Sequence, residues 1–191
     1  MSGEGARLEQ RALLEKLLAG DPLRMRALAA VAELKLPDCW IGAGFVRDAV
    51  WDDRHGQSPM PPSGDVDVLW FAPDVTDKEA DRDIERQLRS SMPDLLWSVK
   101  NQARMHRHNG DAPYHSVADA MTHWPETATA VAARLAGGRV EISAPLGLDD
   151  LFALRVRPTA AFRSEKRSIF DERIASKRWI ERYPLLIILD E

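Results

Sequence analysis

The chain has 191 residues, of which 45% are hydrophobic, and its formal net charge is −4. This length and composition suit one domain with a sizeable core, and the negative charge argues against a protein that coats nucleic acid. A single cysteine excludes an internal disulfide and is typical of a reducing compartment. Residues 1–11 lack the apolar segment of a signal peptide, and no apolar run approaches a membrane span. We therefore expect a cytoplasmic protein with no membrane segment.

The first half of the chain predicts two helices, followed by two strands with a helix between them. Apolar residues at helical spacing predict a helix over 7–19, and Asp21-Pro22 begins a second helix that runs to about residue 36. A short strand is predicted at 39–41. A glycine turn then leads to a helix over 45–51, a loop rich in Pro, Gly and Ser, and an alternating strand over 65–70.

The second half predicts further helices and strands in alternation. Residues 100–115 are polar and basic with little periodicity, which is typical of a loop or a functional surface. The other predicted elements are a charged helix from 76 or 77 to 91, a strand at 95–99, one or two helical turns at 117–121, an Ala- and Thr-rich helix from 125 to Gly137-Gly138, a strand at 139–143, a short helix at 148–154 and a long basic helix over 162–183. This order predicts an α+β fold in which helices flank a mixed sheet.

Two aspartates share one face of the predicted strand at 65–70. Residues two apart on a strand lie about 6.6 Å apart along the backbone and point the same way. Asp65 and Asp67 therefore face one side, while Val66 and Val68 face the other. Two like charges side by side repel each other, and a divalent cation removes that penalty. The pair predicts a site for Mg²⁺ or Mn²⁺, and the alternative is a solvated pair at a strand edge.

Small residues precede the predicted helix at 45–51. Ala43 and Gly44 let backbone amides approach a phosphate group, and the helix dipole favours an anion there. The alternative is an ordinary tight turn. Arg47 can add positive charge at the same place. We also predict that Lys100 and Arg104 contact phosphate or substrate, the alternative being a solvated loop.

A third carboxylate is needed to complete a site for two metal ions. Glu141 is the best candidate, because it lies between two β-branched residues on the predicted strand 139–143, where a glutamate is unusual. We expect it beside the aspartate pair if the two strands are neighbours, and exposed on an edge strand if they are not. Asp149 and Asp150 are alternatives, although Asp149 fits a helix cap better. The histidines fit no standard zinc spacing.

Two motifs resemble the signature of the polymerase β-like nucleotidyltransferase superfamily, in the version found in CCA-adding enzymes and poly(A) polymerases. They are AGFVRD at 43–48 and DVDV at 65–68, with Ala43 where the first of two glycines usually stands. Three more motifs are similar to those of a family of small bacterial nucleotidyltransferase-like proteins of unassigned substrate: WSVKNQARMH at 97–106, WPETATA at 124–130 and APLGLDDL at 144–151. The resemblance covers residues 10–184.

The resemblance implies a mixed sheet flanked by helices, Mg²⁺ held by Asp65 and Asp67, and a third carboxylate on a later strand, a position that Glu141 fits. We predict one domain over 1–191, with N-terminal helices at 1–36, a catalytic part at 37–155 and a helical extension at 156–191. We expect this domain to transfer a nucleoside monophosphate from an NTP to an unidentified hydroxyl acceptor, with release of pyrophosphate.

Two alternatives stay open at this point. The first is a catalytically silent module that binds a nucleotide or a protein on the same fold, because fold does not fix function. The second is an enzyme that acts on RNA, which the short chain and the negative charge do not favour. The sequence leaves the NTP, the acceptor and the oligomeric state open.

Overall fold

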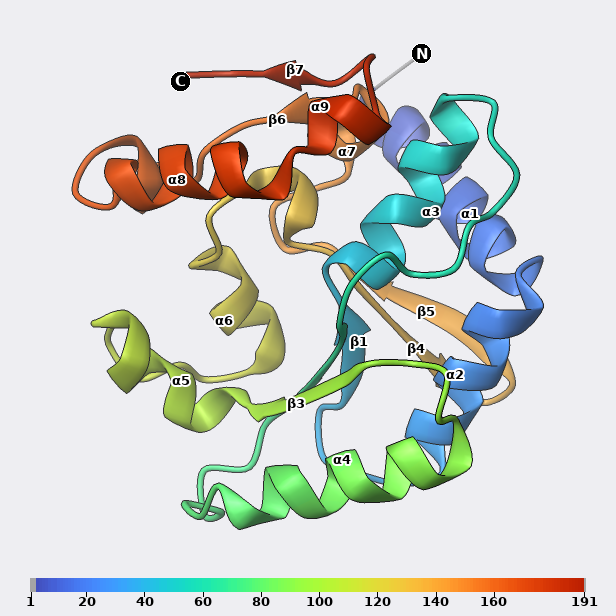
Figure 1. Cartoon of the computed structure of the whole chain (residues 1–191), viewed down its shortest axis with the longest axis vertical. Coiled ribbons are helices and arrows are strands. Elements are labelled where there is room, and N and C mark those ends of the chain that lie inside the picture. Colours follow the sequence, from blue (N-terminus) through green and yellow to red (C-terminus); the bar gives the residue numbers. More distant parts are fainter. Residues whose placement is uncertain (1–2, 191) are drawn as a thin grey trace.

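The computed structural model describes residues 3–190 and has a five-stranded mixed sheet at its centre (Figure 1). The strand order is β3-β2-β1-β4-β5, in which β2 and β3 are parallel and the other neighbouring pairs are antiparallel. These strands are β1 Trp40–Gly42, β2 Val66–Trp70, β3 Trp97–Asn101, β4 Ala132–Ala136 and β5 Arg139–Ser143. A separate parallel pair is formed by β6 Arg155–Val156 and β7 Ile187–Ile188.

Helices lie on both faces of the sheet and along one end of it (Figure 1). The α-helices are α1 Gly3–Ala19, α2 Pro22–Ala32, α3 Gly44–Arg54, α4 Glu79–Ser91, α5 Gln102–Asn109, α6 Val117–Thr122, α7 Asp149–Phe152, α8 Arg167–Lys177 and α9 Trp179–Arg182, and two 3-10 turns are η1 Thr127–Thr129 and η2 Ala160–Arg163. Within the described residues, no helix combines the length and apolar character needed to cross a bilayer. The predicted α+β class with a mixed, helix-flanked sheet is confirmed.

The two faces of β2 belong to two different hydrophobic clusters. Val66 and Val68 are fully buried in the main core, together with leucines from α1, α2 and α4. Leu69 points the other way and packs in a smaller cluster with residues of α6 and β4. Since side chains alternate along a strand, Asp67 lies on the same face as Leu69. The larger core thus fixes β2 from behind, and the aspartates face the more sparsely covered side.

The predicted helix from 125 to 137 is wrong. That segment forms η1 and then β4, a strand whose Ala132 and Ala133 are fully buried. β4 pairs with β1 on one side and with β5 on the other. Alanine favours helices in isolation, but hydrogen bonding to two neighbouring strands outweighs that preference.

Two other segments also differ from the sequence-based expectation. Part of the predicted loop at 100–115 is helix α5, which Asn101 caps by accepting a hydrogen bond from the amide of Ala103, 3.1 Å away. Gly110 ends this helix in the left-handed conformation. The predicted long helix at 162–183 is divided into η2, α8 and α9, and Arg178, with φ of 49°, separates α8 from α9.

Candidate active site

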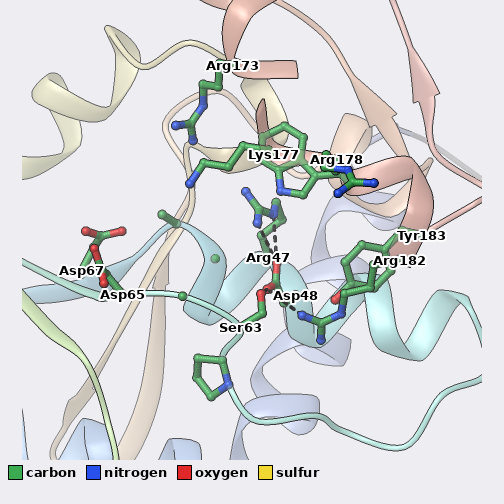
Figure 2. Close-up of a pocket in the computed structure, with 15 residues that line it drawn as sticks. Arg47, Asp48, Ser63, Asp65, Asp67, Arg173, Lys177, Arg178, Arg182 and Tyr183 are labelled. Carbon is green, nitrogen blue, oxygen red and sulfur yellow. Dashed lines mark hydrogen bonds and ion pairs between the residues drawn. The ribbon is translucent and has the colours of Figure 1, made fainter. Parts of the chain in front are cut away.

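β2 places two aspartates at one side of a cavity (Figure 2). Asp67 lies on β2, and Asp65 comes immediately before the strand. Across the sheet, Asp67 is opposite Gly42 on β1 and beside Ser98 on β3. The alternation seen in the sequence therefore corresponds to a real geometry, in which Asp65 and Asp67 face the same cavity.

Burial raises the pKa of Asp67 above its usual value, and the charge of Asp65 raises this pKa further. A hydrogen bond from Ser98 and the positive charges of Lys177 and Arg173 oppose these effects without cancelling them. The doubly ionised pair is thus disfavoured in the protein alone. A divalent cation between the carboxylates would favour the ionised form.

The turn from β1 into α3 brings the helix N-terminus to the same cavity. A Cβ atom on Gly42 would lie 2.7 Å from Leu69 Cδ1 and 3.2 Å from Trp124 Cη2, so only glycine fits there without a shift. The next residue, Ala43, has φ of 54° and ψ of −128°, a conformation that glycine adopts far more easily. Such a backbone costs on the order of 1–3 kcal/mol. α3 starts directly afterwards, at Gly44.

Arg47 lies in the first turns of α3 and is nearly fully buried. Its guanidinium group packs against two indole rings, 4.4 Å from the centroid of Trp51 and 4.5 Å from that of Trp179, and these rings contact each other edge-on with centroids 5.6 Å apart. It also donates hydrogen bonds to Asp48, at 2.8 and 3.1 Å, and to the hydroxyl of Thr129, at 3.1 Å. Arg47 therefore lines the cavity, but contacts that join α3 to α9 and η1 already occupy most of its guanidinium group.

The cavity next to the aspartates has a volume of about 510 Å³, within the range of small-molecule sites. Figure 2 shows that its walls come from the turn before α3, the loop before β2, and helices α8 and α9. The basic residues that line it are Arg47, Arg173, Lys177, Arg178 and Arg182, and the acidic ones are Asp48, Asp65 and Asp67. Cations thus gather around the aspartate pair, which suits a polyanionic ligand.

The basic residues of α8 and α9 differ in how far they are already neutralised. Three have carboxylate partners: Arg173 pairs with Glu126, Arg178 with Glu181, and Arg182 with Asp48 and Asp52. Lys177 is exposed and forms no ion pair with any residue in the range 3–190. It points toward the cavity in Figure 2. Lys177 is therefore the cation with the most charge left for a ligand.

A nucleotidyltransferase family model matches residues 29–188, most of the chain. The chain belongs to this nucleotidyltransferase family. A solved structure described as revealing a CCA-adding enzyme head domain is 34% identical to it, with a TM-score of 0.83, and the match covers 93% of this chain and 95% of that one. No curated protein matches the sequence.

Two larger enzymes share the fold of this nucleotidyltransferase at low sequence identity. A CCA-adding enzyme in complex with CTP is 15% identical, with a TM-score of 0.57, and the match covers 92% of this chain and 43% of that one. A tRNA-processing enzyme in its apo form is 15% identical, with a TM-score of 0.52, covering 86% and 42%. This chain thus spans less than half of the length of either enzyme.

In the folded nucleotidyltransferase, Glu141 does not lie beside Asp65 and Asp67. β4 and β1 separate β5 from β2, which amounts to roughly 14 Å at the usual strand spacing. Glu141 instead pairs with Arg134, directly opposite on β4, at 2.6 Å. Of the two arrangements considered, the edge strand is the one found, because β5 forms a hairpin with β4 at the sheet edge, and the predicted place of Glu141 beside the aspartates is therefore wrong. Among residues 3–190, no group of three or more His, Cys, Asp or Glu side chains is arranged to hold a metal.

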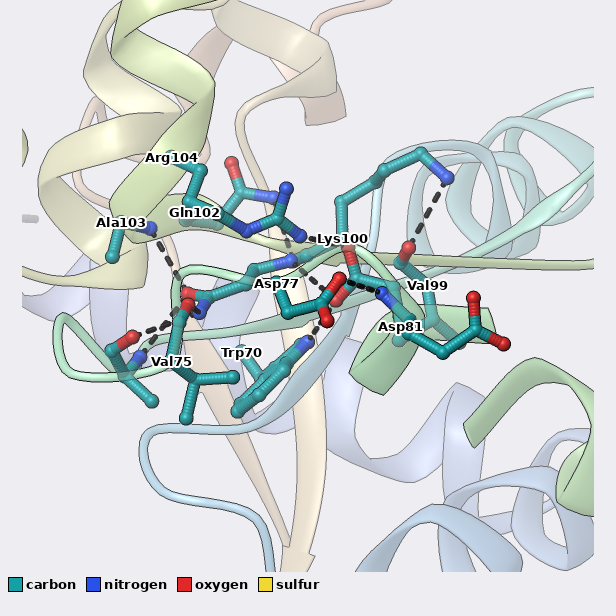
Figure 3. A network of polar contacts seen from close by, with 12 residues as sticks. Trp70, Val75, Asp77, Asp81, Val99, Lys100, Gln102, Ala103 and Arg104 are labelled. Carbon is teal, nitrogen blue, oxygen red and sulfur yellow. Dashed lines mark hydrogen bonds and ion pairs between the residues drawn. The ribbon is translucent and has the colours of Figure 1, made fainter. Parts of the chain in front are cut away.

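The predicted phosphate contacts Lys100 and Arg104 belong to another part of the nucleotidyltransferase. Arg104 pairs with the buried carboxylate of Asp81, which also accepts hydrogen bonds from Trp70 Nε1, at 2.9 Å, and from the amide of Asn101, at 3.1 Å (Figure 3). This network joins α4, β2 and β3. Lys100 is 3.5 Å from Glu85 and lines a different cavity, described below. Neither residue lines the cavity of Figure 2.

Sequence reasoning missed the contribution of the C-terminal helices to the site. Arg173 and Lys177 are four residues apart, so they lie on one face of α8. The many Lys and Arg residues over 162–183 indicated a basic helix, but they did not indicate which face of this helix would lie near β2. Asp48 was also missed, although it directly follows Arg47 in the AGFVRD motif.

Proposed function

We propose that this nucleotidyltransferase transfers a nucleoside monophosphate from an NTP to a hydroxyl acceptor, with Mg²⁺ or Mn²⁺ held by Asp65 and Asp67. One observation carries the proposal: the aspartate pair, the start of α3 and the basic side of α8 face a single cavity. When bound, the cation stabilises charge on the phosphate oxygens during an in-line displacement.

The donor set fits such a cation even without Glu141. Mg²⁺ is usually bound through one or two carboxylates, with phosphate oxygens and water as its other ligands. Asp65 and Asp67 supply two carboxylates, and burial together with the charge of Asp65 raises the pKa of Asp67, so a bound cation would favour its ionised form. An NTP supplies the remaining oxygen ligands.

The protein's own residues then hold the triphosphate. The amides at the start of α3 and the dipole of this helix favour an anion beside Gly44. Lys177 adds a cation from the opposite wall. Arg47, packed against both Trp51 and Trp179, joins α3 to α9, so that the phosphate groups meet a preformed site.

A catalytically silent module is the second candidate, and the position of Glu141 favours it. Two-metal catalysis needs ligands for a second cation, and the described residues provide no third carboxylate beside the pair. A silent module would bind Mg²⁺–NTP without releasing pyrophosphate. The two candidates therefore differ in turnover rather than in binding.

The test measures pyrophosphate release from each NTP in the presence of a cell extract as a source of acceptor, together with Tm. We expect Mg²⁺ with the correct NTP to raise Tm more than either alone, since a ligand at a hundredfold excess over Kd adds about 2.7 kcal/mol. Asp67→Asn should lower turnover by about 10³-fold, or about 4 kcal/mol. The matched control is Asp74→Asn, an exposed aspartate outside the cavity.

Near-normal turnover in Asp67→Asn at saturating Mg²⁺ would show that the site is assigned incorrectly. A Tm shift with Mg²⁺–NTP but no pyrophosphate release from any NTP would favour the silent module.

A further inference from the structure

A second cavity, of about 480 Å³, meets the first at the aspartate pair. Both cavities are lined by Ala43, Asp67 and Arg173. The second cavity continues between the sheet, α5, η2, α8 and the segment after α6, and its lining includes Met105, His123, Trp124, Phe162 and Ile169. The nucleotidyltransferase therefore has two adjoining spaces, one on each side of Asp67.

The order of residues along β2 indicates which cavity holds the triphosphate and which holds the nucleophile. Asp65 lines only the first cavity, Asp67 lines both, and Leu69 lines only the second. In an in-line displacement the nucleophile approaches the phosphorus from the side opposite to the leaving group. If the triphosphate occupies the first cavity, with its α-phosphate near Asp67, the nucleophile enters from the second.

The walls of the second cavity limit the chemistry of its occupant. Trp124, Phe162 and Met105 give it an aromatic and apolar surface, and Gln102 and Asn109 add hydrogen-bonding amides. Of the described residues that line it, Asp67 is the sole carboxylate. A molecule with several positive charges would therefore find no acidic partner in the lining apart from Asp67.

The lysines and the arginine that line the second cavity already have carboxylate partners. Each has a carboxylate partner outside the lining: Lys100 pairs with Glu85 at 3.5 Å, Lys166 with Asp111 at 2.7 Å, and Arg173 with Glu126 at 2.5 Å. Nucleic acid is bound largely through cations that neutralise its phosphates. The pairing of these cations, with the net charge of −4, does not favour a polyanion.

We propose that the second cavity binds the acceptor, and that the acceptor is a small, uncharged molecule with a hydroxyl group on an aromatic or apolar framework. The proposal rests on the transferase function above. The acceptor oxygen forms a bond to the α-phosphorus, the bond from this phosphorus to the α,β-bridging oxygen breaks, and pyrophosphate leaves. The hydroxyl proton passes to solvent.

Two isoleucines on the C-terminal helices allow a matched test. Ile169, on α8, is 51% exposed and lines the second cavity, whereas Ile180, on α9, is 42% exposed and lines neither cavity. Ile169→Glu introduces a charge into the apolar wall, and Ile180→Glu introduces the same charge elsewhere. Because both side chains are exposed, both variants should fold, which Tm confirms.

The experiment incubates each protein with Mg²⁺, NTPs labelled at the α-phosphate, and either the small-molecule filtrate, the RNA or the protein fraction of a bacterial extract. We expect label on a product in the filtrate whose precursor passes through both cation and anion exchangers. Ile169→Glu should reduce this labelling about tenfold, whereas Ile180→Glu should leave it within twofold of the wild type. The Kd for Mg²⁺–NTP should be the same in all three proteins.

Label on RNA or protein, a precursor retained by either exchanger, or equal labelling by the two variants would overturn the acceptor assignment. So would normal Mg²⁺–NTP binding without label in the filtrate. A wild-type protein that does not bind Mg²⁺–NTP at all would instead overturn the transferase function on which the assignment rests.

Discussion

Two regions of the molecule present basic residues near β2, and they use them differently. In the network around Asp81, Arg104 meets a buried carboxylate, and Asn101 caps α5 (Figure 3). In the cavity around Asp67, Lys177 is exposed, and the residue before α3 is Ala43, which has no polar side chain to cap the helix. The first region pairs its arginine with a buried carboxylate, although Arg104 Nε has no hydrogen-bond partner, and the second leaves Lys177 for a ligand. A basic residue near a site is thus informative only once its carboxylate partner is known.

Arg104→Ala should produce the largest effect, and it should affect stability alone. The substitution leaves the Asp81 carboxylate buried without its cation, which costs about 3–5 kcal/mol of unfolding free energy. Denaturant unfolding measures this loss, and Arg107→Ala, an exposed arginine on the same helix, is the control. A tenfold weaker Kd for Mg²⁺–NTP in Arg104→Ala would contradict the comparison, because it would place Arg104 in the site.

Lys177→Ala should weaken ligand binding and leave stability almost unchanged, the opposite of Arg104→Ala. Lys177 is exposed, so its loss should change the unfolding free energy by less than about 0.5 kcal/mol. The loss of one charge-assisted contact to phosphate should weaken Mg²⁺–NTP binding about tenfold, or about 1.4 kcal/mol. Calorimetric titration measures this Kd, with Arg89→Ala on α4 as the control. An unchanged Kd would show that the cations of α8 do not contact the nucleotide.

Ala43→Gly and Ala103→Gly should have opposite effects on stability, because the N-termini of α3 and α5 differ in backbone strain. Relief of the strain at Ala43, of order 1–3 kcal/mol, should exceed the extra unfolded-chain entropy of glycine, about 0.4–1 kcal/mol. We expect a net gain of about 1 kcal/mol, which for a chain of this length raises Tm by about 2–4 °C. Ala103→Gly, in the first turn of α5, should instead lower Tm. A loss of stability in Ala43→Gly would mean that the turn is not strained.

The pH dependence of Asp67 should be the smallest effect. The pKa of Asp67 is raised in the folded state, so the folded state binds more protons than the unfolded state between the unfolded and folded pKa values. Stability from this group is therefore present below its unfolded pKa and falls as pH rises through that window. In EDTA, the Tm of Asp67→Asn relative to wild type should increase over this range, and Mg²⁺ should reduce the difference. A difference that is independent of pH would refute the assigned direction.

What the sequence could predict depended on how local the determining contacts are. Alternation over 65–70 places Asp65 and Asp67 on one face whatever the rest of the chain does, and the turn before α3 is equally local. Glu141 also lies on a correctly predicted strand. Its distance from the pair depends on strand order, which no local pattern around residue 141 contains. The predicted position of Glu141 beside the aspartate pair is wrong for that reason.

The remaining differences have similar causes. β4 is rich in alanine and becomes a strand only because β1 and β5 pair with it. α5, in contrast, had local signals in Asn101 and Gly110, which the polar and basic composition of the segment obscured. Lys177 is the last residue of α8, which Arg178 ends in a left-handed conformation, and it lines the cavity because α8 packs there. A basic helix is visible in the sequence, but its docking position is a tertiary property.

The packing of Arg47 against both Trp51 and Trp179 has a practical consequence. Trp179 lines the first cavity, whereas Trp51 is fully buried behind it. A ligand that enters the cavity changes the polarity around one indole and leaves the other in its core environment. Intrinsic tryptophan fluorescence can therefore report nucleotide binding through Trp179, one of the six tryptophans of the chain, without a dye or a covalent label.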